Sequence, residues 1–493
     1  MEGLIVSGAA ADRATTRILE GPLAFEVFRF GAPIALGMAL QTTFNLVDAY
    51  LLAQLPKNEV GPALGALGIC DQVAAIGTIL SYGVSTASAA AIAQRKGAGD
   101  EVGVRRAAWQ SLILVGGLGV AFALLGILFA GPILRDVIGA KGEVAEIGAR
   151  YLRVIVGGSF TIFFLLQLTA IQRALGSAKT PAALLVGGNV INLFLAVLMV
   201  FGPGPAPKYL SWATEAAKML HVPRMGMLGA AWATIIARLI VLVPNAWILA
   251  RRFSLLRPPP GERGPDVREL RSMVGVAWPS SAQFVLRIAA GLFVQSMVAR
   301  AFTTQTDQTA TTAMGLVFRL DTMAIFVAMG WGSAAQTFVG QNLGANNEAR
   351  AKRSGLYTAL FDALTNVLLV LFVFRFGEWV LRVFDDDDAP VAIALRYLVV
   401  VAPSYLALGV GVVLGNAMTG AGATRTTLVV DALVILLFQV PICVTGVLLG
   451  WSIDALFRCV AATSVVSAIA YAVAYRKVPW WERASKTAAF RGM

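Results

Sequence analysis

The sequence has few of the residues on which zinc enzymes, disulfide-rich proteins and ATPases depend. It contains one histidine, His221, so the usual histidine-rich zinc site is not expected and no metal site is predicted. Its three cysteines, Cys70, Cys443 and Cys459, lie in or beside apolar segments, where we expect packing rather than disulfides. The stretch "GSAKT" lacks the Gly-x4-Gly-Lys pattern that cradles phosphates. ATP is therefore not expected to be the direct energy source, and no cofactor is predicted.

Charged residues are also scarce, at 14% of the chain, while 57% of the residues are hydrophobic and the mean hydropathy is +0.73. Such a composition indicates an integral membrane protein. Segments such as "LILVGGLGVAFALLGILF" are continuous apolar runs, whereas a membrane barrel would show short alternating ones. We predict an all-α, polytopic fold with twelve transmembrane helices. The expected spans are 25–53, 64–94, 107–131, 149–173, 181–202, 228–250, 271–301, 310–340, 355–379, 392–418, 427–449 and 455–475.

The formal charge of +12 does not predict nucleic-acid binding. In a membrane protein, the positions of Lys and Arg between the spans indicate the orientation of the chain. Seventeen of the 40 basic residues lie in four stretches, "AQRKGAGDEVGVRRA", "RRFSLLRPPPGERGPDVRELR", "GANNEARAKRSG" and "YRKVPWWERASK". These four stretches share one side of the membrane, and the positive-inside rule makes that side cytoplasmic. The N-terminus lacks the features of a cleaved signal. We expect a multi-pass protein of a bacterial-type inner membrane with both termini in the cytoplasm.

The chain contains two copies of one pattern, offset by about 246 residues. "AIAQRKGAGDEVGVRRA" corresponds to "TFVGQNLGANNEARAKRS", so Gln94 matches Gln341; "RALGSAKT" corresponds to "TGAGATRT", so Gly176 matches Gly422. An even number of spans per copy gives two homologous lobes of parallel orientation, a plan typical of transporters. We predict an N-terminal six-helix lobe over 1–250, a cytoplasmic linker over 251–271 and a C-terminal six-helix lobe over 272–493.

Gly97 and Gly344 occupy matching positions where long helices are expected to end. A residue just past a helix often adopts the left-handed conformation that glycine tolerates best. We therefore interpret both glycines as C-cap residues with an architectural role.

The order and spacing of these features resemble one known family. The duplicated halves, "NLVDAYLLAQL" in the first span, "VGQNLGANNEARA" after the eighth and "TGAGATRT" after the tenth are similar to the multidrug and toxic compound extrusion (MATE) family over nearly the whole chain. The resemblance implies a secondary antiporter and not an enzyme. It would export cationic or amphipathic organic compounds in exchange for protons or sodium ions, by opening a cavity between two lobes alternately to each face.

Asp48 is the main candidate for ion coupling. Gln41, Asn45 and Asp48 are spaced i, i+4 and i+7, which places them on one face of the first helix. A carboxylate in a membrane span is expensive, so it indicates a functional site unless a neighbouring hydroxyl or amide merely holds it in place. The resemblance likewise assigns an aspartate at this position to cation coupling.

Asn189, Asn192 and Thr234 are expected to add polar groups to the same lobe. Asn192 resembles an asparagine of the family. Where many family members carry a second acid, however, this chain has Ala196. Because sodium prefers several oxygen ligands, the loss of one carboxylate favours protons over sodium, although Asp48, Asn192 and Thr234 could still form a sodium site.

The second lobe carries Arg287, Arg319 and Asp321 inside its spans. We expect Arg287 or Arg319 to pair with Asp321, and Asp431 to pair with Arg425. One interpretation is a static ion pair that fixes the helix register. The other is that an arginine lines the cavity, repels cations and favours anionic or zwitterionic substrates.

Phe164 and Phe284 are candidates for an apolar part of the substrate cavity, although phenylalanine in a membrane helix commonly serves packing. One other function stays open, because the arginines also suit a flippase for a polyprenyl-linked lipid precursor. A magnesium-dependent membrane enzyme would need a second acidic cluster facing "DDDD" at 385–388. The sequence shows none, so we interpret "DDDD" as part of a solvated outer loop. The expected partners are a small-molecule substrate and membrane lipid, with a monomer as the oligomeric state. The sequence does not identify the substrate, its charge or the coupling ion.

Overall fold

The computed structural model describes residues 13–482 except 140, 253–257, 259–260, 262, 305–306 and 386. It describes the backbone but not the side chains of 41–49, 57–58, 64 and 252. All regular elements in the described part are helical, and twelve segments are long and apolar enough to cross a membrane. The prediction of an all-α, twelve-helix membrane protein is confirmed. The helices are α2 (Leu23–Ala53), α3 (Lys57–Gly97), α4 (Glu101–Pro132), α5 (Gly142–Gly157), α6 (Ser159–Ala174), α7 (Lys179–Phe201), α8 (Ser211–Met219), α9 (Met227–Arg252), α10 (Val267–Phe302), α11 (Thr309–Gly344), α12 (Glu348–Arg382), α13 (Asp388–Val401), α14 (Tyr405–Gly420), α15 (Thr424–Val434), α16 (Val440–Leu448) and α17 (Ile453–Lys477).

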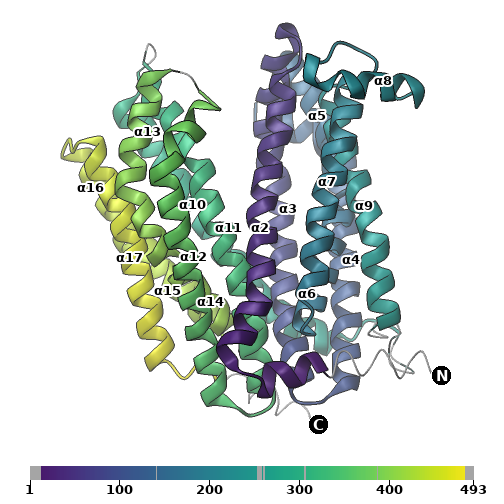
Figure 1. Ribbon diagram of the computed structural model, residues 1–493, viewed down its shortest axis with the longest axis vertical. Coiled ribbons are helices and arrows are strands. Elements are labelled where there is room, and N and C mark those ends of the chain that lie inside the picture. The colour runs from purple at the N-terminus through teal and green to yellow at the C-terminus, as the bar shows by residue number, and fades with distance from the viewer. Residues whose placement is uncertain are drawn as a thin grey trace.

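The helices form two groups, which we call the N lobe (α2–α9) and the C lobe (α10–α17) (Figure 1). Helix α2 begins and α17 ends at the same end of the molecule, which is the lower end in Figure 1. The ribbons of the two lobes converge at this lower end and diverge toward the upper end. The short helix α8 lies at the upper end of the N lobe. Contacts between the lobes are therefore to be sought near the lower end.

Both lobes interrupt one transmembrane segment at the same place. In the N lobe, α5 and α6 are separated at Gly158. In the C lobe, the 3-10 turn η3 (Ala402–Ser404) separates α13 from α14. Glycine is a poor helix former, and Pro403 lacks the N–H that a continuous helix would use. Since the two breaks lie about 246 residues apart, the duplication noted in the sequence extends to the shape of the helices.

The segment that joins the two lobes is hydrogen-bonded to α4 just before α10 begins. Gln110 donates its side-chain Nε2 to the carbonyl of Gly264 at 2.9 Å, and its Oε1 accepts from the backbone N–H of Asp266 at 2.9 Å. The Asp266 carboxylate in turn accepts from the first backbone N–H groups of α10, as an N-cap does. Helix α10 thus starts at Val267, within the predicted linker 251–271.

Candidate functional site

The lobes meet at the lower end through two related hydrogen bonds. Gln94 on α3 donates Nε2 to the carbonyl of Gly420, the last residue of α14, at 2.8 Å. Gln341 on α11 donates Nε2 to the carbonyl of Ala174, the last residue of α6, at 2.8 Å. All four residues are buried. Because Gln94 matches Gln341 and Ala174 matches Gly420 in the repeat, the contact is nearly symmetric, and each lobe holds the other in the same way.

Gly97 and Gly344 allow the two long helices to approach each other at this contact. A Cβ on either glycine would lie 1.9 Å from the backbone oxygen of the contact glutamine in the opposite lobe. The prediction that they are left-handed C-caps is wrong, since both are the last residues of their helices and positive φ occurs two residues later, at Gly99 and Asn346. Glycine is needed here because two helix backbones leave no room for a side chain.

Two further polar contacts join the lobes near the same end. Gln336 on α11 donates Nε2 to the carbonyl of Thr86 on α3 at 2.7 Å. Arg95 at the end of α3 forms an ion pair with Glu269 in the first turn of α10, with Nη2 and Oε1 2.8 Å apart. Both side chains of the ion pair are largely buried. Side-chain hydrogen bonds and an ion pair between the lobes thus close the lower end.

The predicted coupling residues of α2 lie outside the residues whose side chains the structure describes. These are Gln41, Asn45 and Asp48, and only their helical backbone is described. Helix α2 packs against α7. The two predicted asparagines of α7, Asn189 and Asn192, are both partly buried. The grouping of Asp48 with these asparagines therefore stays a prediction.

The other predicted residues of the N lobe have ordinary packing roles in this conformation. Thr234 donates its hydroxyl to the carbonyl four residues earlier in its own helix, α9, at 2.9 Å. Phe164 packs beside α4 within its own lobe. Phe284 of the C lobe is different, because its ring centroid lies 5.3 Å from that of Tyr82 on α3 of the N lobe. Of these three, only Phe284 contributes to a contact between lobes.

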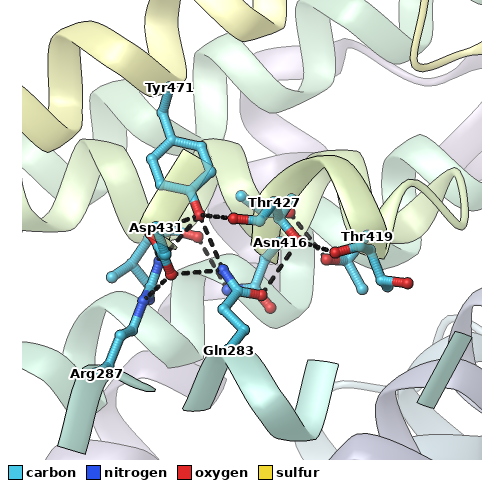
Figure 2. Close-up of polar contacts among 10 residues, drawn as sticks. Gln283, Arg287, Asn416, Thr419, Thr427, Asp431 and Tyr471 are labelled. Carbon is cyan, nitrogen blue, oxygen red and sulfur yellow. Dashed lines mark hydrogen bonds and ion pairs between the residues drawn. The ribbon is translucent and has the colours of Figure 1, made fainter. Parts of the chain in front are cut away.

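Arg287 takes part in a polar network inside the C lobe (Figure 2). Its Nε and Nη2 donate to the two carboxylate oxygens of Asp431 on α15, at 2.6 and 3.2 Å. The same carboxylate accepts from Gln283 on α10 and from the hydroxyl of Tyr471 on α17, each at 2.8 Å. Thr427 donates to the side-chain oxygen of Gln283 at 3.1 Å. The Asp431 side chain is 4% exposed and that of Arg287 is 30% exposed, so the guanidinium is the accessible member.

The predicted pairing of Asp321 with an arginine is wrong. Asp321 on α11 instead accepts the hydroxyls of Tyr397 and Tyr405, each at 2.6 Å. Arg319 lies two residues away on the same helix and so points in another direction, with its guanidinium 4.2 Å from the centroid of the Phe384 ring. Asp321 thus joins α11 to the broken segment formed by α13 and α14.

The predicted pairing of Asp431 with Arg425 is also wrong. Six residues of α-helix rotate the second side chain well away from the first. Arg425 accordingly is exposed, while Asp431 is buried against α10 and α17. The correct partner is 144 positions away in the sequence, and only the packing of α10 on α15 brings it close.

Arg173 is a candidate that the sequence interpretation missed. It is a partly buried residue in the last turn of α6, and it forms no ion pair within the described part of the chain. Its helix, α6, packs against α3. The sequence offered one signal for Arg173, because the apolar span 149–173 contains no Asp or Glu that could pair with it.

In the described residues, no three His, Cys, Asp or Glu side chains gather as a metal site would require.

Comparison with known proteins gives one family and a consistent set of relatives. The family model MatE matches twice, over residues 33–198 and 284–445. "Probable multidrug resistance protein YpnP" of Bacillus subtilis is 25% identical over 86% of this chain and 88% of its own length. "FAD transporter" of Shewanella oneidensis is 23% identical over 87% of this chain and 89% of its own length. "Probable multidrug resistance protein NorM" of Thermotoga maritima is 23% identical over 88% and 90%.

Solved structures share the fold at low sequence identity. One is described as an outward-facing conformation of a multidrug resistance MATE family transporter, with a TM-score of 0.81 at 22% identity over 97% of this chain and 99% of that one. Another, from Pyrococcus furiosus, has a TM-score of 0.81 and 22% identity with the same coverage, and is described as a transporter whose binding pocket has reverse polarity. These likenesses establish the arrangement of helices.

Proposed function

Because this chain belongs to the MatE family, we propose that it exports small organic compounds in exchange for protons or sodium ions, with its two lobes opening alternately to each face of the membrane. The family and the relatives make it a membrane transporter of multidrug type and not an enzyme. The exchange of ions and the alternation between states are the proposal. Protons are the favoured ion.

The single observation that carries this proposal is the near-symmetric contact of Gln94 and Gln341 at the lower end. Transporters with repeated lobes work by moving one lobe against the other about a site between them. Such a motion needs an interface that is strong enough to close one face and weak enough to open. Each buried glutamine supplies one neutral hydrogen bond, worth about 0.5–1.5 kcal/mol, so the contact can break and re-form.

Asp48 is the residue to which we assign coupling. A carboxyl group inside a membrane span can bind a proton in one state and release it in another, which links ion movement to the motion of the lobes. Ala196, where the resemblance leads one to expect a second acid, is fully buried in the apolar core of the N lobe. One carboxyl with amide neighbours fits proton exchange better than a sodium cage.

We place the lower end in the cytoplasm of a bacterial-type cell. Helices α3 and α17 finish at this end with Arg95, Lys96, Arg476 and Lys477 in their last turns, and the positive-inside rule assigns such basic residues to the cytoplasm. In this orientation the closed lower contact makes the described conformation one that is shut toward the cytoplasm.

The test is transport by the purified chain in sealed vesicles. A panel of fluorescent organic cations and anions is loaded, and proton and sodium gradients are imposed separately on wild type, Asp48→Asn and Asp307→Asn. Asp307 is the matched control. It lies in the exposed loop after α10, where the hydroxyl and the backbone N–H of Thr309 hold the pKa of its carboxyl below the usual range. Its replacement therefore also removes a full charge, but far from the lobes' contact.

We expect one gradient to drive export by wild type and by Asp307→Asn, and Asp48→Asn to lose that response while remaining folded. The gradient that works identifies the ion. If neither gradient moves any compound in the panel, antiport is wrong. Movement of a polyprenyl-linked lipid across the same vesicles would then point to the flippase.

A further inference from the structure

Three aspartates lie away from the ends of the transmembrane segments of the C lobe, and their surroundings differ. Asp431 is paired with Arg287, and Asp321 accepts from two tyrosine hydroxyls. Asp362 on α12 is fully buried, and the side-chain amide of Asn366 donates to it, with Nδ2 3.0 Å from Oδ2. Its other carboxyl oxygen, Oδ1, accepts no hydrogen bond from the described residues. Asp362 is therefore the least stabilised of the three as an anion.

A neutral carboxyl group is the form that these surroundings favour at Asp362. A buried carboxylate needs a cation or several donors, and one amide does not replace them. The Asn366 amide suits both forms of the carboxyl. Its NH2 group donates to a carboxylate, and after a half-turn of the amide its oxygen accepts from the O–H of the acid. This oxygen is also buried and accepts no hydrogen bond from the described residues.

The charged side chains of the neighbouring helices are bonded to groups other than Asp362. Helices α2, α11, α13 and α14 pack against α12. Their described charged side chains and tyrosines pair as follows: Glu26 with Arg29, Tyr50 with Tyr209, Arg319 with the Phe384 ring, Asp321 with Tyr397 and Tyr405, Asp388 with Arg382, and Arg396 with Asp454. The side chain of Asp48 on α2 lies outside the described residues. On α12 itself, the nearest titratable side chain is that of Tyr357, which is exposed.

Helix α14 covers Asp362 and also reaches the contact between the lobes. A Cβ on Gly409 of α14 would lie 1.9 Å from Oδ2 of Asp362, so the helix backbone lies directly against the carboxyl. The same helix ends at Gly420, whose carbonyl accepts the hydrogen bond from Gln94 of the N lobe. Opening of the lower contact therefore removes a bond that holds the end of the helix covering Asp362.

The N lobe also reaches the turn of α12 that carries Asp362. The ring centroid of the adjacent Phe361 lies 5.4 Å from that of Phe28 on α2 and 5.8 Å from that of Trp331 on α11. Trp331 in turn donates Nε1 to the hydroxyl of Thr365, on the next turn of α12, at 3.1 Å. A motion of α2 against the C lobe thus changes the packing around Asp362.

We propose that Asp362 is a proton-binding site inside the C lobe, which holds its proton while the lower end is closed and releases it when that end opens. The inference rests on the proposed antiport and adds to Asp48 a second coupling carboxyl, in the other lobe. A proton that is kept in the state shut toward the cytoplasm and lost in the state open to it moves inward, opposite to the exported compound. Sodium fits less well, because it prefers several oxygen ligands and the pair of Asp362 and Asn366 offers two unused oxygens.

Infrared spectra of the purified full-length chain in detergent test whether Asp362 is protonated. A carboxylic acid has a C=O stretching band that a carboxylate lacks. We expect this band in wild type at neutral pH, with a component that is lost in Asp362→Asn and kept in Asp307→Asn. Asp307→Asn is the matched control, because it removes an exposed carboxylate. Equal bands in all three proteins would overturn the proposal.

Asn366→Leu provides a second test that does not depend on the folding of Asp362→Asn. Without the amide the acid loses its hydrogen-bond partner, so its C=O band should move to higher frequency. A band that stays in place would show that it does not come from Asp362. Sodium chloride should have the same effect on the wild-type band as choline chloride. Loss of the band with sodium alone would identify a sodium site and overturn the assignment to a proton.

Gly97→Ala tests the link between Asp362 and the motion of the lobes. The added Cβ would clash at the lower contact, whereas Gly117→Ala, the control, would meet nothing within 4 Å. We expect a weaker Asp362 band in Gly97→Ala than in Gly117→Ala. In sealed vesicles, Asp362→Asn should move fewer protons per exported compound than wild type. An unchanged band in Gly97→Ala, or an unchanged proton ratio in Asp362→Asn, would overturn the release of the proton during transport.

The spectra separate this inference from the proposed function. They require neither an ion gradient nor a transported compound, so a failure of antiport in vesicles would leave the protonation of Asp362 standing. An ionised Asp362, in turn, would leave antiport through Asp48 untouched.

Discussion

Gly97 of the N lobe and Gln341 of the C lobe approach so closely that a Cβ on Gly97 would lie 1.9 Å from the backbone oxygen of Gln341. The same relation holds between Gly344 and Gln94. Two helix ends thus cross at the lower contact without an intervening side chain, and the glutamine hydrogen bonds depend on that crossing. The close helix approach that closes the lower end therefore depends on Gly97 and Gly344.

Gly97→Ala should destabilise the closed lower end. An added methyl group with no space available costs about 1–3 kcal/mol, which corresponds to roughly a 5- to 150-fold shift away from this state. We expect export by reconstituted vesicles to slow at least fivefold. Gly117→Ala is the control, because a Cβ there would meet nothing within 4 Å. Equal rates for both variants would show that the crossing does not matter for transport.

Gln94→Ala and Gln341→Ala should weaken the contact to a similar degree. Each removes one buried hydrogen bond and leaves a carbonyl without that donor, at a cost of about 1–3 kcal/mol. The rate at which a cysteine introduced near the lower end reacts with a water-soluble maleimide should rise equally in both. A large effect of one variant and none of the other would refute the symmetric description.

Asp431→Ala should be far more harmful than removal of the whole ion pair. Loss of the carboxylate leaves Arg287 without its partner, and breaking a buried pair in this way costs about 3–5 kcal/mol. In Arg287→Met/Asp431→Leu no charge is left, so most of the stability should return. The thermal midpoint in detergent measures both. If the double variant were no more stable than Asp431→Ala, the pair would not be the reason for the loss.

Tyr397→Phe and Tyr405→Phe should each destabilise the C lobe. Both hydroxyls donate to the Asp321 carboxylate, and a hydrogen bond to a charged group contributes about 1.5–3 kcal/mol. We expect the thermal midpoint to fall in each variant and to fall further when both hydroxyls are removed. Tyr357→Phe, at an exposed position on α12, should have no such effect. An unchanged midpoint in both single variants would mean that Asp321 is stabilised in another way.

The fold could be predicted from the sequence because each membrane span is a local run of apolar residues and the two halves share similar motifs. The ion-pair and hydrogen-bond partners within a lobe could not be predicted. Asp431 was expected to bind Arg425, six residues away, but helix packing brings it to Arg287, 144 positions away. Gly97 looked like a helix cap because the sequence does not show which backbone crosses it. Arg173 was missed because an arginine without a partner is recognised only when its surroundings are known.

The most direct test of ion-coupled export measures ion movement that is driven by the compound, whereas the gradient experiment measures compound movement that is driven by an ion. Vesicles containing the purified chain are loaded with the compound that it exports best, no ion gradient is imposed, and the internal pH and sodium concentration are followed as the compound leaves. Coupling predicts that the interior of wild-type vesicles becomes acidic as the compound exits, and that Asp48→Asn vesicles show no acidification. A rise in internal sodium instead would identify the other ion. Exit of the compound from wild-type vesicles without movement of either ion would contradict antiport.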